Sequence, residues 1–188
     1  MDPLLGIPVG LALSTAAGLR VFIPLLLTSL AARFAYLTLA PGMTWIASDA
    51  ALIAFATAAM VEIAAYYVPW LDNIADAVAG PAAVTAGIIE MAAVTPDLPP
   101  LVRWTVAVIA GGGIAGLAQL GTTLLRLKSS TLTAGVGNPV VATGELIGSL
   151  ALAILGLLAP LVAVVIVVIL LAVLARRLFR RRAHSSLP

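Results

Sequence analysis

Charged side chains within long apolar stretches are the residues of this sequence most able to do chemistry. These residues are Arg20, Glu62, Asp72, Asp76, Glu90 and Glu145. If the stretches cross a membrane, an ionised side chain at mid-bilayer costs about 2.5–3.5 kcal/mol on insertion scales. We therefore expect each charged group to face a protein interior, a wet cavity or an opposite charge.

The spacing of three of these acids predicts that they lie at one level. A short turn is expected at residues 69–71, with Glu62 seven residues before its first residue and Asp76 seven residues after it. Seven residues correspond to about 10 Å of helix, so the two carboxylates reach a similar depth. Asp72 shares a helix face with Asp76. Glu145 lies at a similar depth in a later segment that enters from the same side.

Three carboxylates at one level in a low dielectric cannot all stay ionised without a partner. Arg20 is the only arginine expected deep within an apolar stretch. Three interpretations stay open: Arg20 neutralises acids and locks the bundle, the acids bind protons or a cation, or Arg20 binds an anionic substrate. An oxygen-only ligand set suits protons, Na⁺, Mg²⁺ or Ca²⁺. With no cysteine and a single histidine, His184, the sequence predicts no transition-metal centre and no cofactor.

Asn138 is a further candidate ligand, because it stands before Pro139 at the start of an apolar segment. We expect its side chain to cap that helix, with Pro139 in the first turn. The backbone N–H groups there could instead bind an anion. The polar connection before the segment, residues 128–138, is expected to be a surface loop or to dip back into a membrane.

The composition indicates which elements must position these residues. Of 188 residues, 62% are hydrophobic and 10% are charged, and the mean hydropathy is +1.17. Soluble domains are about half apolar and about a quarter charged. The composition therefore excludes a soluble globular enzyme and a disordered chain. The net charge of only +2 argues against a nucleic-acid partner. The expected class is a polytopic membrane protein whose main partner is the lipid bilayer.

A transmembrane helix needs about 20 mostly apolar residues. Six candidate spans cover residues 4–34, 48–69, 72–94, 101–125, 139–158 and 159–178. The expected fold is thus an all-α transmembrane bundle. The first span is too long for one straight helix, and we expect it to be kinked or broken near Pro8, Gly10, Gly18 or Pro24.

Three spans in each half suggest an internal duplication. Residues 1–94 form the first half, residues 95–183 the second, and residues 184–188 a short polar tail. An odd number of spans in each half would make the halves inverted repeats, an arrangement typical of transporters. Paired small residues favour close helix packing within the bundle or between copies in a homo-oligomer. These pairs are Gly6 and Gly10, Gly112 and Gly116, and Gly144 and Gly148.

The basic residues predict the orientation in the membrane. With six spans, both termini share one side, and placing them in the cytoplasm puts seven basic residues inside and two outside. The inner set is Arg126, Lys128, Arg176, Arg177, Arg180, Arg181 and Arg182, and the outer set is Arg33 and Arg103. We therefore expect both termini to be cytoplasmic.

Several of these motifs together resemble a bacterial membrane family, the domain-of-unknown-function 4126 family. The matching elements, over about residues 10–175, are Gly18-Leu19-Arg20 with Pro24, Glu62 with Pro69, Asp72 and Asp76, and Gly137-Asn138-Pro139 with Glu145. The family pattern often has acids where this chain has Tyr66 and Leu146, which weakens transfer of an acid-dependent mechanism. The resemblance implies the architecture and a bacterial inner membrane, but no established activity.

The function favoured by these features is a small transporter or channel with an ion- or proton-linked carboxylate site. A membrane-embedded enzyme acting on a lipid or lipid phosphate is an alternative. The absence of HExxH, GxSxG and phosphatase-like histidine motifs weighs against it. A non-catalytic scaffold held together by its glycines and internal charges is the third interpretation.

Overall fold

The computed structural model describes residues 5–67 and 69–184, without the side chains of residues 69–77, 174, 175 and 177–184. All regular structure in these ranges is helical, and they contain no strand. The first half holds the helices α1 (Gly6–Ala17), α2 (Phe22–Arg33), η2 (Thr44–Ala47), α3 (Asp49–Ala65) and α4 (Pro69–Ala93). The second half holds α5 (Pro100–Val106), η3 (Ala107–Gly112), α6 (Gly113–Thr133), α7 (Asn138–Leu158) and α8 (Pro160–His184).

The break predicted in the first long apolar stretch is confirmed. Residues 18–21 separate α1 from α2, and each of these helices has only 12 residues. At about 1.5 Å per residue, neither reaches the roughly 30 Å of a bilayer core. The stretch is therefore two half-length helices, with a non-helical link between them.

The turn between α3 and α4 lies earlier than the sequence indicated. The Ser48 side chain caps α3 by accepting a hydrogen bond from the Ala51 N–H at 3.1 Å. The helix then ends at Ala65, and α4 already begins at Pro69. The expected turn at residues 69–71 was wrong because proline fits the first turn of a helix, where its missing N–H has no partner to lose.

The connection before α7 also differs from the expectation. Helix α6 continues through Lys128 to Thr133, and Ala134 and Gly135 then adopt left-handed backbone angles, with φ of 50° and 87°. Only residues 134–137 separate α6 from α7. The expected loop over residues 128–138 is thus mostly helix, and the short turn leaves no room for a re-entrant segment.

Within the described residues, two helical stretches are long and apolar enough to cross a membrane. They are Pro100–Thr133, which joins α5, η3 and α6, and Asn138–Leu158, which is α7. The first contains a π-helical turn at Ala107–Gly112, where the run of three glycines begins. Shorter apolar stretches cover Gly6–Ala17, Phe22–Arg33, Val78–Ala93 and Pro160–Val173.

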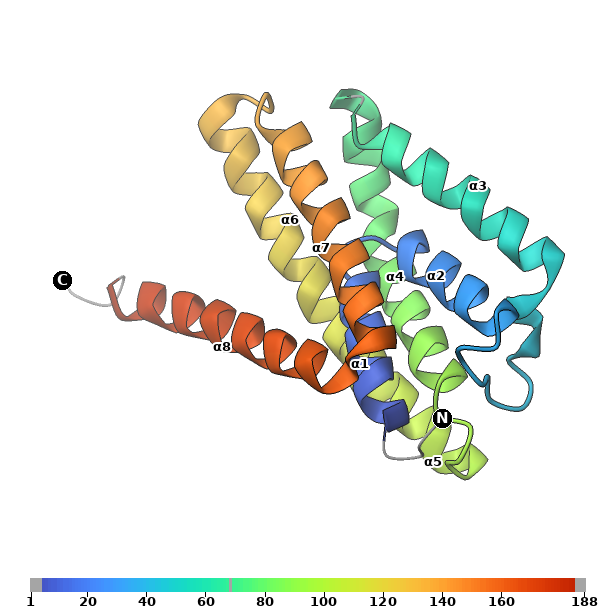
Figure 1. The fold of residues 1–188 in the computed structure, drawn as a ribbon. Coiled ribbons are helices and arrows are strands. Elements are labelled where there is room, and N and C mark those ends of the chain that lie inside the picture. Colours follow the sequence, from blue (N-terminus) through green and yellow to red (C-terminus); the bar gives the residue numbers. More distant parts are fainter. Residues whose placement is uncertain (1–4, 68, 185–188) are drawn as a thin grey trace.

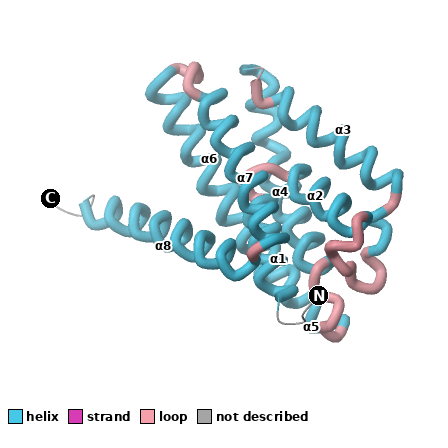
Figure 2. Tube along the Cα trace, in the orientation of Figure 1, coloured by secondary structure: helices cyan, strands magenta, loops and turns pink. Residues whose placement is uncertain are grey.

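Helix α1 lies at the centre of the bundle. It packs against α4 from the first half and against α6, α7 and α8 from the second (Figure 1). Val9, Leu13 and Ala16 are fully buried in the common hydrophobic core. Figure 2 shows most loops at the ends of the bundle and the link between α1 and α2 in its middle, whereas α8 extends away from the other helices. The two halves therefore share one core.

Most of the paired glycines lie at helix contacts within the chain. A Cβ atom at Gly6 or Gly10 would overlap atoms of Val94 or Met91, and one at Gly112 would lie 2.9 Å from Ile88. A Cβ atom at Gly116 or Gly148 would lie 3.3 Å from the nearest side-chain atom, and one at Gly144 would have no neighbour within 4 Å. These contacts account for tight packing within one chain, and the homo-oligomer stays a prediction.

Gly111 is the position in η3 where we expect a substitution to be least tolerated. A Cβ atom there would lie 2.5 Å from the Gly87 carbonyl oxygen and 2.7 Å from the Met91 Cβ. Gly111→Ala should therefore destabilise the protein by about 1–3 kcal/mol through overpacking. Gly113→Ala is the matched control, because Gly113 has no neighbour within 4 Å. Thermal unfolding in detergent should show a lower Tm for the first variant alone, and equal Tm values would contradict this packing.

Candidate functional site

The link between α1 and α2 is fixed by close packing. The Gly18 N–H donates to the carbonyls of Ser14 and Thr15 at 3.1 Å, which closes α1. A Cβ atom at Gly18 would overlap the Ala115 carbonyl oxygen of α6. Glycine thus lets the chain turn directly against α6 and carries Arg20 into the interior, where it is 2% exposed.

Glu62 holds the start of α2 from the neighbouring helix α3. Its Oε1 accepts a hydrogen bond from the Val21 N–H at 2.8 Å, and its Oε2 accepts one from the Phe22 N–H at 3.1 Å. The first N–H groups of a helix lack partners within the helix and carry partial positive charge. The Glu62 carboxylate therefore takes the role of a capping side chain, but from another helix.

Arg20 points from the link toward α7. Its Nη2 donates to the Ala142 carbonyl oxygen at 2.8 Å and lies 3.4 Å from Glu145 Oε2. Its Nε and Nη1 are buried and have no hydrogen-bond partner among the described residues. Arg20 thus joins the link to α7 and keeps two donors for a further polar group.

Arg126 of α6 forms the closest ion pair with Glu145. Its Nε donates to Glu145 Oε1 at 2.9 Å, and its Nη2 donates to Oε2. This two-point geometry is the strongest form of an arginine–carboxylate pair. Both side chains are 5% exposed, so Glu145 serves two buried guanidinium groups.

Tyr66 connects the two arginines. The guanidinium carbon of Arg20 lies 4.0 Å from the centroid of the Tyr66 ring, and that of Arg126 lies 3.9 Å from it. Cations at this distance from an aromatic ring are attracted by its quadrupole. We call the set of Arg20, Glu62, Tyr66, Arg126 and Glu145 the charge cluster.

The structure brings together three of the residues singled out from the sequence: Arg20, Glu62 and Glu145. The sequence reasoning missed Arg126, which it treated as a charge at a span end that anchors the topology. Because α6 runs on to Thr133, Arg126 lies about two turns inside the helix and is 4% exposed. A signal for this pairing was available in the spacing. Arg126 lies eight residues before the turn at residues 134–137 and Glu145 eight residues after it, so the two side chains reach the same level of the paired helices.

Tyr66 was also missed, because the sequence marks it only as a residue that stands where the family pattern often has an acid. It stands four residues after Glu62, which is one helical turn, and its side chain is 6% exposed. Residues four apart share a helix face. That spacing could have placed Tyr66 beside the glutamate.

Asn138 does not cap α7, as the sequence suggested. Helix α7 begins at Asn138 itself, its cap residue is Gly137, and no side chain caps it. The Asn138 Nδ2 instead donates to Ser130 Oγ of α6 at 3.0 Å, which ties the two ends of the turn together. Pro139 lies in the first turn of α7, as expected. Asn138 thus lies about two turns along α7 from Glu145.

Asp72 and Asp76 lie on the first turns of α4. Their side chains fall outside the described residues, so their place in the candidate site stays a prediction. Among the described residues, no group of three or more His, Cys, Asp or Glu side chains lies close enough to hold a metal ion.

Glu90 is a second buried acid, which the sequence placed only near a span end. It lies in the last turn of α4, is 0% exposed, and its Oε2 accepts a hydrogen bond from Thr28 Oγ1 of α2 at 2.7 Å. Its Oε1 has no hydrogen-bond partner in the described part of the chain, and neither does the buried hydroxyl of Ser29, the residue after Thr28. Glu90 is therefore enclosed without the arginine partners of Glu145.

Two substitutions of Glu90 should show whether its shape or its charge matters more for the stability of the protein. Glu90→Gln keeps an acceptor for Thr28 and should stay within about 1 kcal/mol of the wild type, because no described cation loses a partner. Glu90→Ala should lose about 2–3 kcal/mol, since it leaves the Thr28 hydroxyl buried without an acceptor beside a cavity. Tryptophan fluorescence during heating would report both Tm values. A larger loss of stability in Glu90→Gln than in Glu90→Ala would contradict the hydrogen bond between Thr28 and Glu90.

The described residues thus form an all-helical bundle with a charge cluster buried at a helix break. The chain belongs to the family of the domain of unknown function DUF4126, whose family model matches residues 7–180. This match confirms the family that the sequence motifs resemble. No curated protein and no solved structure matches the chain.

Proposed function

We propose that the protein is a small membrane transporter or channel whose charge cluster is a proton- or ion-linked site. The observation that carries this proposal is the meeting of Arg20, Arg126, Glu62 and Glu145 at the break between two half-length helices. Buried ionisable groups and discontinuous helices are the usual features of transport sites within a bilayer.

A membrane setting is supported by the surface of the bundle. Large apolar side chains are exposed on several helices, among them Ile53, Ile109, Leu120, Ile147, Val165 and Ile169, each more than half exposed. Such a surface is unusual for a soluble monomer. We propose six spans in a bacterial inner membrane, with both termini in the cytoplasm.

The inverted repeat belongs to the same proposal. Each half contributes one buried arginine and one glutamate to the cluster: Arg20 and Glu62 from the first, Arg126 and Glu145 from the second. Each half also has an irregular first span, broken at residues 18–21 or π-helical at Ala107–Gly112. Related halves meeting at one site are the common plan of transporters.

Glu62 offers a physical means of coupling a proton to movement. As a carboxylate it accepts two N–H groups at the start of α2. Protonation removes its negative charge and weakens this cap, because hydrogen bonds to a charged acceptor are roughly twice as strong as neutral ones. The link between α1 and α2 then loosens, and α2 can tilt relative to α1.

Flux measurements in liposomes test this function. Purified protein would be reconstituted with a pH-sensitive dye inside, and proton uptake would be driven by a potassium diffusion potential. A second arm would follow radioactive sodium. We expect uptake above that of protein-free liposomes in one arm, and a loss of roughly tenfold or more in Glu62→Gln, equivalent to about 1.4 kcal/mol or more.

Asp49→Asn is the matched control for this experiment. It also neutralises an acid of α3, but the Asp49 side chain is 83% exposed and pairs with Arg33 at the surface. It should leave the flux unchanged. Wild-type flux equal to that of empty liposomes in both arms, or equal flux in Glu62→Gln, would contradict the proposal and favour a scaffold whose charges only lock the bundle.

A further inference from the structure

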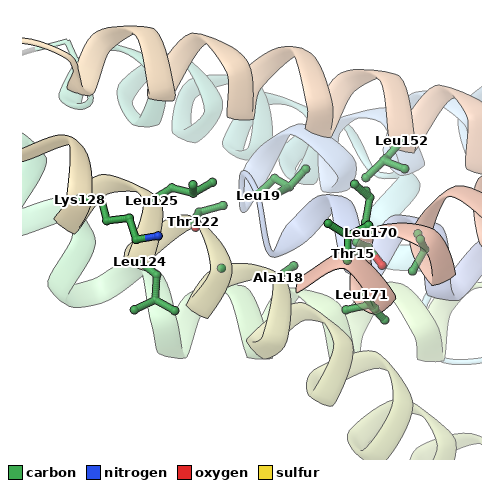
Figure 3. Close-up of a pocket in the computed structure, with 13 residues that line it drawn as sticks. Thr15, Leu19, Ala118, Thr122, Leu124, Leu125, Lys128, Leu152, Leu170 and Leu171 are labelled. Atoms are coloured by element: carbon green, nitrogen blue, oxygen red, sulfur yellow. The ribbon is translucent and has the colours of Figure 1, made fainter. Parts of the chain in front are cut away.

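A cleft of about 390 Å³ lies beside the charge cluster, between α1, α6, α7 and α8 (Figure 3). Its lining is almost entirely apolar, with Thr15 and Thr122 as polar exceptions and Lys128 at one end. Leu19, the residue before Arg20 in the link between α1 and α2, also lines the cleft. The cleft therefore reaches the helix break from the side of the bundle.

The cleft opens sideways because α6 and α8 do not pack along each other. Helix α8 packs on α1 and α7, but has no extended contact with α6. Figure 1 shows α6 and α8 diverging toward the left of the view. The α8 side chains Val167, Leu170 and Leu171 form one wall of the cleft, and Leu124 and Leu125 of α6 form the other. In a bilayer, this opening would face the acyl chains.

Lys128 gives the cleft a charged end. Figure 3 shows its amino nitrogen beside the labelled side chains of Thr122 and Leu125. The side chain is exposed and forms no ion pair with the described residues. Arg126, two residues earlier, does not line the cleft and pairs with Glu145. Lys128 is thus the one cation among the residues that line the cleft.

We propose that this cleft binds one acyl chain of an anionic phospholipid, with the phosphate at Lys128. The apolar walls match a hydrocarbon chain, which gains van der Waals contacts in a shaped apolar site. The ammonium group of Lys128 matches a phosphate and, beyond it, an anionic headgroup. This inference goes beyond the proposed transport function: it rests on the proposed membrane setting but not on transport. A bound chain would contact Leu19 and so brace the helix break.

Native mass spectrometry of the detergent-purified protein would test the lipid site. The probes are phosphatidylglycerol and phosphatidylcholine with identical acyl chains. We expect one tightly retained phosphatidylglycerol. Lys128→Gln should lower its retention at least about fivefold relative to phosphatidylcholine, which corresponds to about 1 kcal/mol. Leu170→Trp, which narrows the cleft, should lower the retention of both lipids.

Arg176→Gln is the charge-matched control. It removes one positive charge from an exposed position on α8 that does not line the cleft, so the retention of phosphatidylglycerol should be unchanged. Equal loss in Arg176→Gln and Lys128→Gln would overturn the site in favour of general charge attraction. A dimer that dissociates in Leu170→Trp and retains no lipid would overturn it too, since a second copy would then cover the cleft.

Discussion

Glu145→Gln is expected to lower the free energy of unfolding by about 3–5 kcal/mol, which is typical when one partner of a buried ion pair is removed. Glu145 pairs with Arg126 at two points and lies 3.4 Å from Arg20. Its loss leaves two buried guanidinium groups with one fewer carboxylate. For a chain of this size, each kcal/mol lowers the Tm by about 2–4 °C.

A double-mutant cycle makes the result specific to the ion pair. Arg126→Met removes the second charge and fills similar space, so Glu145→Gln combined with Arg126→Met should be more stable than Glu145→Gln alone. The coupling should reach about 1–3 kcal/mol, as for contacting residues. Asp49→Asn is the control, because its pair with Arg33 is exposed and such pairs contribute about 0–1 kcal/mol. Additive losses at Arg126 and Glu145 would contradict the pairing.

Tyr66→Ala is expected to lose about 3–5 kcal/mol, from the cavity that it leaves and from two cation–π contacts. A series of substitutions separates these causes. Tyr66→Phe keeps the ring between the guanidinium groups of Arg20 and Arg126 and should be the mildest change. Tyr66→Leu keeps much of the volume without a π-system and should lie between phenylalanine and alanine.

Thermal unfolding of the three Tyr66 variants provides the measurement. The order of Tm should be phenylalanine, leucine, alanine. Tyr67→Ala is the control on the neighbouring residue, because the Tyr67 side chain is 45% exposed and its hydroxyl lies 2.8 Å from Thr143 Oγ1. A leucine variant as stable as the phenylalanine variant would show that the ring acts by volume alone.

The sequence was sufficient for the helical class, for the break in the first span and for the family. Low charge and long apolar runs permit few alternatives to helices, and glycine and proline mark where a helix must end. Arg20, Glu62 and Glu145 could be singled out because a charge in an apolar segment needs a partner. Composition and spacing carried the helical class, the break and these three residues, and the resemblance of the motifs carried the family.

The remaining features depend on where helices end and how they turn against one another. Moving the α6 end from residue 125 to Thr133 changes Arg126 from a terminal charge into a buried partner of Glu145. Likewise, beginning α4 at Pro69 shifts the expected depths of Asp72 and Asp76 relative to Glu62. Glu62 as a cap for α2, and Thr28 as a donor to Glu90, arise from contacts far apart in sequence. No local pattern encodes such contacts.

The meeting of arginine and glutamate groups at the helix break can be measured directly by solid-state NMR in lipid bilayers. The chain has three glutamates, Glu62, Glu90 and Glu145, so selective labelling of glutamate carboxyl carbons gives three signals. With arginine nitrogens also labelled, the Glu145 carbon should show strong dipolar coupling to guanidinium nitrogens, and the Glu90 carbon none. Single Glu→Gln variants would assign the signals. A Glu145 signal without coupling to any arginine would contradict the charge cluster on which the proposed function depends.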